Sequence, residues 1–191
     1  MTYSTPVLRD FQRYDGLTIA LHWLTAFLVL LQFVLGECWS WPTKPVHHLM
    51  VVAHLSAGIV LSAIMLFRIV WRLTKGRHLP GPLQPMHRAL ALGVEATLYV
   101  LILAEIVLGY LWRWGGGQAM SFFGVLIPSP LPHFQPALLA WIHSIHHWNA
   151  WLIVALATGH GMAVLFHHFI LHDTLLERMR PCVFFGARRK G

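Results

Sequence analysis

Four long stretches of this chain are almost free of charged side chains, and they constrain the fold more than any other feature. Residues 16–36 and 45–67 contain no Asp, Glu, Lys or Arg, and residues 89–112 contain only two glutamates. The stretch from 114 to 172 contains none. About 20 apolar residues in a helix span the ~30 Å hydrocarbon core of a bilayer. The predicted membrane spans are roughly residues 16–37, 46–68, 88–112 and 137–168.

Composition agrees with this interpretation. Only 11% of the residues are charged and 57% are hydrophobic, whereas a soluble domain carries about 25% charged residues. Four spans use most of the 191 residues and leave no length for a second globular domain. We therefore predict an all-α integral membrane four-helix bundle that forms a single domain over residues 1–191.

The distribution of positive charge predicts the orientation of the bundle. Of the 14 Lys and Arg, all but Lys44 and Arg113 flank the spans on the side of the two termini. The positive-inside rule then places both termini in the cytoplasm. Because topology explains the net charge of +7, a nucleic-acid partner is not needed to account for it.

Two other features of the sequence, the length of the first apolar stretch and the positions of the cysteines, bear on this topology. The first apolar stretch is too long for the h-region of a cleaved signal peptide, and no small-x-small cleavage site follows it, so we expect it to stay as the first helix. Cys38 and Cys182 fall on opposite sides of the predicted membrane and cannot pair within one chain. No CxxCH motif is present, which argues against a covalently attached haem c.

The connections between the spans differ in character. Residues 73–86 contain three prolines and are predicted to form a cytoplasmic loop. The outer loop over residues 115–136 is long for a bundle connection. Its apolar middle, residues 120–127, is predicted as a short interfacial helix, either a functional lid or a plain surface cover.

Four histidines lie inside the predicted spans at two matched depths. His54 and His146 fall near the outer end of their helices, and His22 and His160 fall in the cytoplasmic half. His146 and His160 are 14 residues apart on one helix, which corresponds to a rise of about 21 Å and nearly four full turns. Depth therefore pairs His54 with His146 and His22 with His160.

Paired imidazoles at two levels favour two haem b groups, each with two axial histidines. Polar residues at membrane depth are rare and tend to be functional, although a single buried histidine is more often a packed core residue. Zinc or copper is the rival metal, and it would need three or four ligands converging at one level. Small residues beside the histidines would let a flat macrocycle approach the backbone: Gly58, Gly159 and Gly161.

The chain resembles the bacterial cytochrome b561 family along essentially its whole length. The motifs are LHW at residues 21–23, AHLSAG around His54, the His146/His160 pair and HHFILHDTLLERMRP over residues 167–181. The resemblance implies four helices, two haems b, and electron transfer coupled to the quinone pool in the bacterial inner membrane. For its superoxide-oxidising members it implies a superoxide:ubiquinone oxidoreductase activity, with electrons passing at the haem edges and no separate catalytic residue.

Two alternatives to superoxide chemistry stay open. The same cofactors would serve a conduit from quinol to a periplasmic acceptor, and a histidine-rich metal or ion transporter is the more distant possibility. An anionic substrate should be attracted by positive charge at the outer surface. That surface has only Lys44 and Arg113 as cations, with Glu37 nearby, so the superoxide prediction is weaker than the cytochrome prediction.

Three further residues are candidates for supporting roles. His167 follows His160 by seven residues, so it shares that helix face about two turns nearer the cytoplasm. It is predicted to contact a haem propionate or quinone, with a plain interfacial histidine as the alternative. Glu95 and Glu105 are intramembrane acids. We predict that Glu95 relays protons or tunes a ligand histidine.

Overall fold

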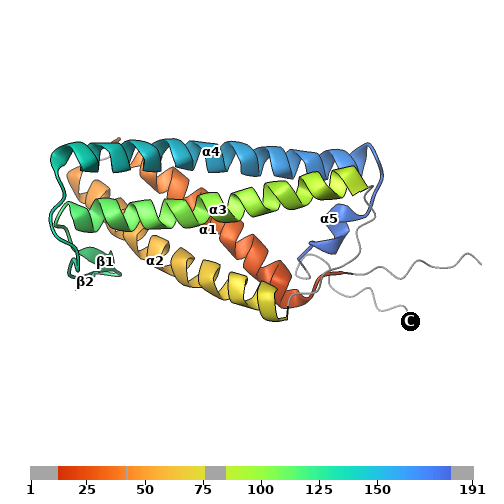
Figure 1. The fold of residues 1–191 in the computed structure, drawn as a ribbon, viewed down its shortest axis with the longest axis horizontal. Helices are drawn as coiled ribbons and strands as arrows, with labels where there is room; N and C mark the ends of the chain where they lie inside the picture. The colour runs from red at the N-terminus through yellow and green to blue at the C-terminus, as the bar shows by residue number, and fades with distance from the viewer. Residues whose placement is uncertain (1–12, 42, 76–84, 182–191) are drawn as a thin grey trace, which may run out of the picture.

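The computed structural model describes residues 13–41, 43–75 and 85–181, and it is mostly helical (Figure 1). Four of its helices are long and apolar enough to cross a membrane, which confirms the predicted four-helix bundle. The predicted loop over residues 73–86 lies partly, and Cys182 wholly, outside the described residues. The helices are α1 (Gly16–Cys38), α2 (Lys44–Thr74), α3 (Pro85–Gly115), α4 (Pro136–Phe169) and the short α5 (Leu175–Arg178).

The bundle consists of two antiparallel helix pairs. α1 packs mainly on α2, and α3 packs mainly on α4, with fewer contacts between the two pairs. A small core joins the pairs at mid-height, with Met65 almost completely buried. The looser packing between the pairs matters because it leaves space for a cavity. The buried core residues are Leu28, Leu61, Met65, Ile102 and Ile153.

Local signals define where the helices begin. The Asp15 side chain accepts a hydrogen bond from the Thr18 backbone N–H at 2.8 Å and so caps α1. α2 and α4 each carry a proline in the first turn, Pro45 and Pro136, where its missing N–H costs nothing. Figure 1 shows that these two helices start at the same end of the bundle, which sets a common depth scale for the histidines that they carry.

A two-stranded hairpin occupies the apolar middle of the long loop, so the prediction of an interfacial helix over residues 120–127 is wrong. β1 (Met120–Phe122) pairs antiparallel with β2 (Val125–Ile127). Phe123 and Gly124, between the strands, have φ of 49° and 92°. Positive φ at both central residues makes the tight turn that matches the twist of a hairpin. Gly124 adopts a positive φ without strain, and a glycine at this position also disfavours the predicted helix over residues 120–127.

The hairpin end of the bundle is the end that carries β1, β2 and the first turns of α2 and α4; the terminal end is the opposite one. The hairpin is attached to α2 through Ser56, which is 1% exposed. The Ser56 hydroxyl accepts a hydrogen bond from the Phe123 N–H at 2.8 Å and lies 3.3 Å from the Ser121 carbonyl oxygen. Ser56 follows His54 by two residues, so the hairpin is connected to a helix turn that carries a candidate site residue.

We predict that Ser56→Ala weakens the docking of the hairpin on α2. The Phe123 N–H loses its partner, and a typical hydrogen bond contributes about 0.5–1.5 kcal/mol. Amide hydrogen exchange of residues 120–127 should become roughly 2- to 13-fold faster. Ser62→Ala is the matched control, because Ser62 donates to the Gly58 carbonyl within the same helix. Equal exchange in both variants would contradict the role of Ser56.

At the terminal end, the described end of the chain folds back against the start of α1. The Trp23 Nε1–H donates to the Met179 carbonyl at 2.8 Å, and the Tyr14 N–H donates to the Arg178 carbonyl at 3.3 Å. His172, with φ of 51°, lies in the turn that reverses the chain after α4. The residues just before α1 and just after α5 therefore lie together at the terminal end.

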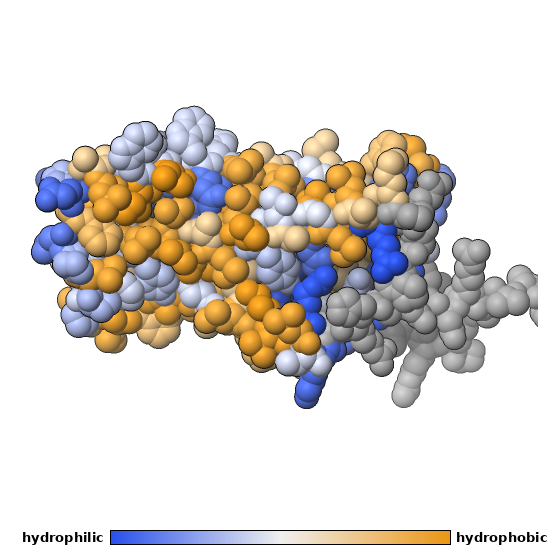
Figure 2. Space-filling model, in the orientation of Figure 1, coloured by the Kyte–Doolittle hydropathy of each residue, from blue (hydrophilic) through white to orange (hydrophobic). Residues whose placement is uncertain are grey.

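The flanks of the bundle are apolar. Leu66, Leu90 and Phe27 are each at least 60% exposed, and Figure 2 shows apolar side chains over most of the middle of the visible face. Exposed apolar area on this scale is a liability in water. It is the surface that the hydrocarbon of a bilayer would cover.

Candidate functional site

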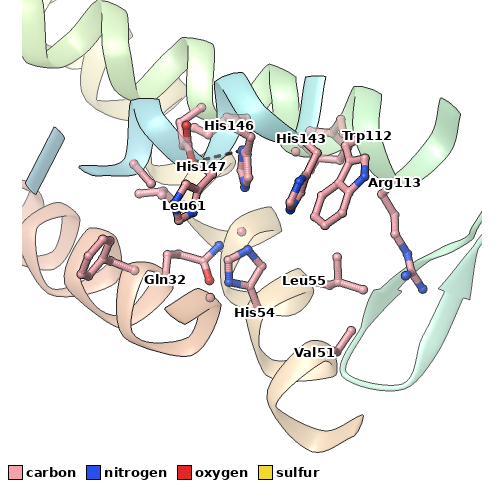
Figure 3. Close-up of a pocket in the computed structure, with 18 of the residues that line it drawn as sticks. Gln32, Val51, His54, Leu55, Leu61, Trp112, Arg113, His143, His146 and His147 are labelled. Atoms are coloured by element: carbon pink, nitrogen blue, oxygen red, sulfur yellow. Dashed lines mark ion pairs between the residues drawn. The ribbon is translucent and has the colours of Figure 1, made fainter. Parts of the chain in front are cut away.

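A cavity of about 800 Å³ lies at the hairpin end, between the two helix pairs. All four long helices contribute to its wall, together with Met120 of the hairpin. His54 from α2 and His146 from α4 both line it, with their rings directed toward one another (Figure 3). The volume falls in the range typical of pockets for cofactors and other small molecules.

The two histidines stand at the same depth for a simple reason. His54 lies ten residues after the first residue of α2, and His146 lies ten residues after the first residue of α4 (44 to 54, and 136 to 146). Ten residues of helix rise about 15 Å. Because both helices start at the hairpin end, their imidazoles meet at one level, close enough to interact electrostatically.

Two glycines allow neighbouring helices to pack directly behind these rings. A Cβ at Gly36 of α1 would lie 3.6 Å from Cε1 of His54, and a Cβ at Gly109 of α3 would lie 3.4 Å from Cε1 of His146. Larger side chains at either position would push the ring. Sequence reasoning missed both residues, because a glycine in an apolar helix does not show which neighbour it meets.

The glycines singled out from the sequence have other surroundings. A Cβ at Gly58 would lie 2.8 Å from the amide nitrogen of Gln32, which also lines the cavity. Cβ atoms at Gly159 and Gly161 would meet nothing within 4 Å. Both glycines lie on the exposed flank of α4, whereas Gly58 accommodates the side chain of Gln32.

Three buried polar atoms of residues that line the cavity lack partners. Nδ1 of His54, Nδ1 of His146 and Oε1 of Gln32 are buried, and none has a hydrogen-bond partner among the described residues. Such atoms are uncommon in folded proteins. A planar metallomacrocycle between two neutral imidazoles would occupy this space, so the donor set fits a haem with two axial histidines.

An acid stands behind one of the two rings. Oε1 of Glu105 lies 3.0 Å from Nδ1 of His146, although the pair does not meet hydrogen-bond geometry. The Asn149 amide donates to Oε2 of Glu105 at 2.7 Å and to the Leu101 carbonyl at 3.0 Å. Asn149 thus holds the carboxyl group of Glu105 at the back of the His146 ring.

The second histidine pair lies nearer the terminal end. His22 lies six residues after the start of α1, and His160 lies nine residues before the end of α4, so both belong to the half of the bundle nearer the terminal end. Nη2 of Arg68 lies 3.3 Å from Nδ1 of His22. The Arg68 guanidinium also lies over the Tyr99 ring, 4.9 Å from its centroid, a cation–π arrangement that holds its position.

Glu95 has a different partner from Glu105. Its carboxylate pairs with Arg72 through two contacts of 2.7 and 3.1 Å. This ion pair ties α3 to α2 near the terminal end. The acid beside a candidate ligand is therefore Glu105, whereas sequence reasoning had placed the tuning role on Glu95.

His167 also has an acidic partner. Its Nδ1 lies 2.5 Å from Oδ2 of Asp173, and the other carboxylate oxygen of Asp173 accepts from the Leu175 N–H. The His87 ring of α3 meets the His167 ring edge-on, with centroids 6.2 Å apart. These contacts orient His167 in the turn at the end of α4.

Other histidines surround the mouth of the cavity at the hairpin end. His147 lies 3.4 Å from a Glu37 oxygen, and the His143 ring packs on Trp112 with centroids 4.4 Å apart. Within residues 13–41, 43–75 and 85–181, no three His, Cys, Asp or Glu side chains converge as a metal-ion site. The donors thus occur as imidazole pairs, which favours haem over zinc or copper.

Fold and site together define a membrane four-helix protein with paired imidazoles at two levels. Sequence comparison names the class. The model of the prokaryotic cytochrome b561 family matches residues 13–181. The chain belongs to this family of haem b proteins for membrane electron transfer, which favours electron transfer over ion transport.

The chain is also similar to individual proteins, most of which are named as b-type cytochromes. The chain is 34% identical over 180 residues to cytochrome b561 homolog 2 of Escherichia coli, covering 88% of this chain and 91% of the relative. It is 31% identical over 179 residues to a cytochrome b562 of Cereibacter sphaeroides, covering 88% and 96%. It is 26% identical over 176 residues to a probable superoxide oxidase of Yersinia pestis, covering 89% and 97%.

Proposed function

We propose that the chain is a di-haem b oxidoreductase of the bacterial inner membrane that takes electrons from superoxide and passes them to ubiquinone. The observation that carries this proposal is that His54 and His146 face each other across one cavity, with a second histidine pair, His22 and His160, nearer the terminal end of α1 and α4. Both termini are placed in the cytoplasm on the charge distribution, so that the hairpin end faces the periplasm.

His54 and His146 would hold the haem at the hairpin end, and His22 and His160 the other. Haem b, when bound, supplies reversible one-electron transfer. With two histidines holding each haem, the iron would offer no position to a substrate, and the chain would bring substrates to the haem edges. Gly36 and Gly109, packed against the rings of His54 and His146, hold this pair in position.

Arg113 is the residue best placed to attract an anion at the hairpin end. It lines the cavity and is labelled near its mouth in Figure 3. Its Nε–H donates to the Ala119 carbonyl at 2.9 Å, and its guanidinium contacts Gln118. These contacts hold a permanent positive charge beside the pocket, which supports superoxide as the electron donor.

His167 is the proposed contact for quinone at the terminal end, with a haem propionate as the other group that it would bind. A quinone needs protons as well as electrons. The imidazole next to the Asp173 carboxylate is a group that holds and transfers a proton, and it follows His160 by two turns. This placement supports quinone reduction on the cytoplasmic side.

A conduit from quinol to a periplasmic acceptor is the second candidate. It is favoured by the acid at the same cavity, because Glu37 lines the pocket with Arg113 and offsets its charge. The electrostatic attraction of a small anion to the pocket is then weaker, so its association is accelerated less. A periplasmic protein would instead dock over the exposed side chains of the hairpin end, such as Trp41, which is 81% exposed.

Mixing the oxidised holoprotein with superoxide in a stopped-flow instrument separates the two candidates. We expect haem reduction near the diffusion limit, and about tenfold slower reduction in Arg113→Gln with a weaker dependence on salt. Arg113→Lys, which keeps the charge, should retain most of the rate. A wild-type protein that quinol reduces but superoxide does not would overturn the superoxide proposal and support the conduit.

A further inference from the structure

The two imidazole pairs have ionisable groups of opposite type beside them, one acidic and one basic. At the hairpin end the group next to a ligand ring is the carboxyl group of Glu105, 3.0 Å from Nδ1 of His146. At the terminal end it is the guanidinium of Arg68, 3.3 Å from Nδ1 of His22. Each contact is with the ring nitrogen that an Nε2-bound iron leaves free.

The carboxyl group is fixed and shielded. Its side chain is 19% exposed and that of His146 is 16% exposed. Asn149 occupies one oxygen, so the other is directed to His146. In its carboxylate form, Glu105 places negative charge 3.0 Å from the free ring nitrogen of His146, and this charge stabilises ferric iron, the more positive state.

The guanidinium is fixed as well, and it has no acid partner in the part of the chain that the structure describes. Arg72, one turn further along α2, is neutralised by Glu95, whereas Arg68 packs on Tyr99. A guanidinium stays charged and accepts no proton. Whichever nitrogen of His22 holds a proton, a positive charge stands beside the ring and favours ferrous iron, which carries one positive charge less.

We propose that Glu105 and Arg68 set the reduction potentials of the two haem sites apart, with the hairpin-end site lower and the terminal-end site higher. An electron shared between the sites then resides at the terminal end, the end that carries His167. This gives the pathway a direction, from the periplasmic surface to quinone. The inference rests on the proposed di-haem function, and both residues act as positioning and tuning residues.

The test is a redox titration of the purified holoprotein followed at the haem α band. The wild type should titrate in two steps. Glu105→Gln should raise the lower potential by at least a tenfold change in the one-electron equilibrium constant, which is 59 mV. Arg68→Gln should lower the higher potential by at least the same 59 mV, and Arg68→Lys, which keeps the positive charge, should restore it.

Glu37→Gln is the matched control for Glu105→Gln, since it removes an acid from the same cavity that contacts His147 and no candidate ligand. The inference would be overturned if Glu37→Gln shifted the lower potential as much as Glu105→Gln does. It would also be overturned if neither Glu105→Gln nor Arg68→Gln changed a potential. If Glu105→Gln does not bind haem, the Arg68 variants decide alone. A wild type with one haem per chain overturns the di-haem proposal, whereas two haems of equal potential overturn only the inference.

Discussion

Replacing His146 with alanine is expected to remove one of two haems and to leave the other in place. The ring is buried in a cavity of about 800 Å³ opposite His54, and alanine leaves one side of the iron without a ligand. The pair at the terminal end involves different residues, so its haem should stay bound. Haem content per chain and the α-band spectrum measure both effects, and we expect half of the wild-type haem.

His143→Ala is the control for this variant. His143 lines the same cavity and packs on Trp112, but it lies only seven residues after the start of α4, whereas His54 and His146 each lie ten residues after the start of their helix. It should therefore retain both haems. Loss of haem in His143→Ala with retention in His146→Ala would show that the wrong histidine had been assigned.

Replacing His160 with alanine is expected to remove the haem at the terminal end and to abolish electron transfer to quinone. His22 then has no partner across the bundle. The hairpin-end haem should still be reduced rapidly by superoxide but should reoxidise slowly when ubiquinone is added. Stopped-flow absorbance separates the two phases, and the loss in the second phase should exceed tenfold.

Two further variants test this interpretation. His167→Phe should keep both haems and slow only the quinone phase, because His167 contacts Asp173 and His87 rather than His22. His172→Asn, in the exposed turn with positive φ, should change neither phase. Rapid quinone reduction in His160→Ala would contradict a quinone site at the terminal end.

Much of the bundle could be predicted from the sequence because a membrane simplifies the problem. A stretch of about 20 residues without charge has one stable form in a bilayer, a spanning helix. Depth along such a helix follows from residue number, so the matched levels of His54 with His146 and of His22 with His160 could be predicted. The hairpin could not, because a short apolar segment outside a span forms a helix or strands with similar ease.

The two acids of α3 show where this reasoning stops. Glu95 and Glu105 are ten residues apart on one apolar helix, and residue number gives the depth of each but not its partner. Partners depend on the rotation of α3 about its axis and on which helices flank it. The structure pairs Glu95 with Arg72 and places Glu105 behind His146. The proposed tuning role therefore belongs to Glu105 and not to Glu95.

The sequence by itself determined the four spans and the two levels of histidine, because hydrophobic length and helical rise are properties of a single helix. Only the tertiary structure decided which side chains touch each ring: Gly36, Gly109, Glu105 and Arg68. The physical reason is that contacts between helices depend on their packing angles and rotations, which arise from all side chains of the bundle at once.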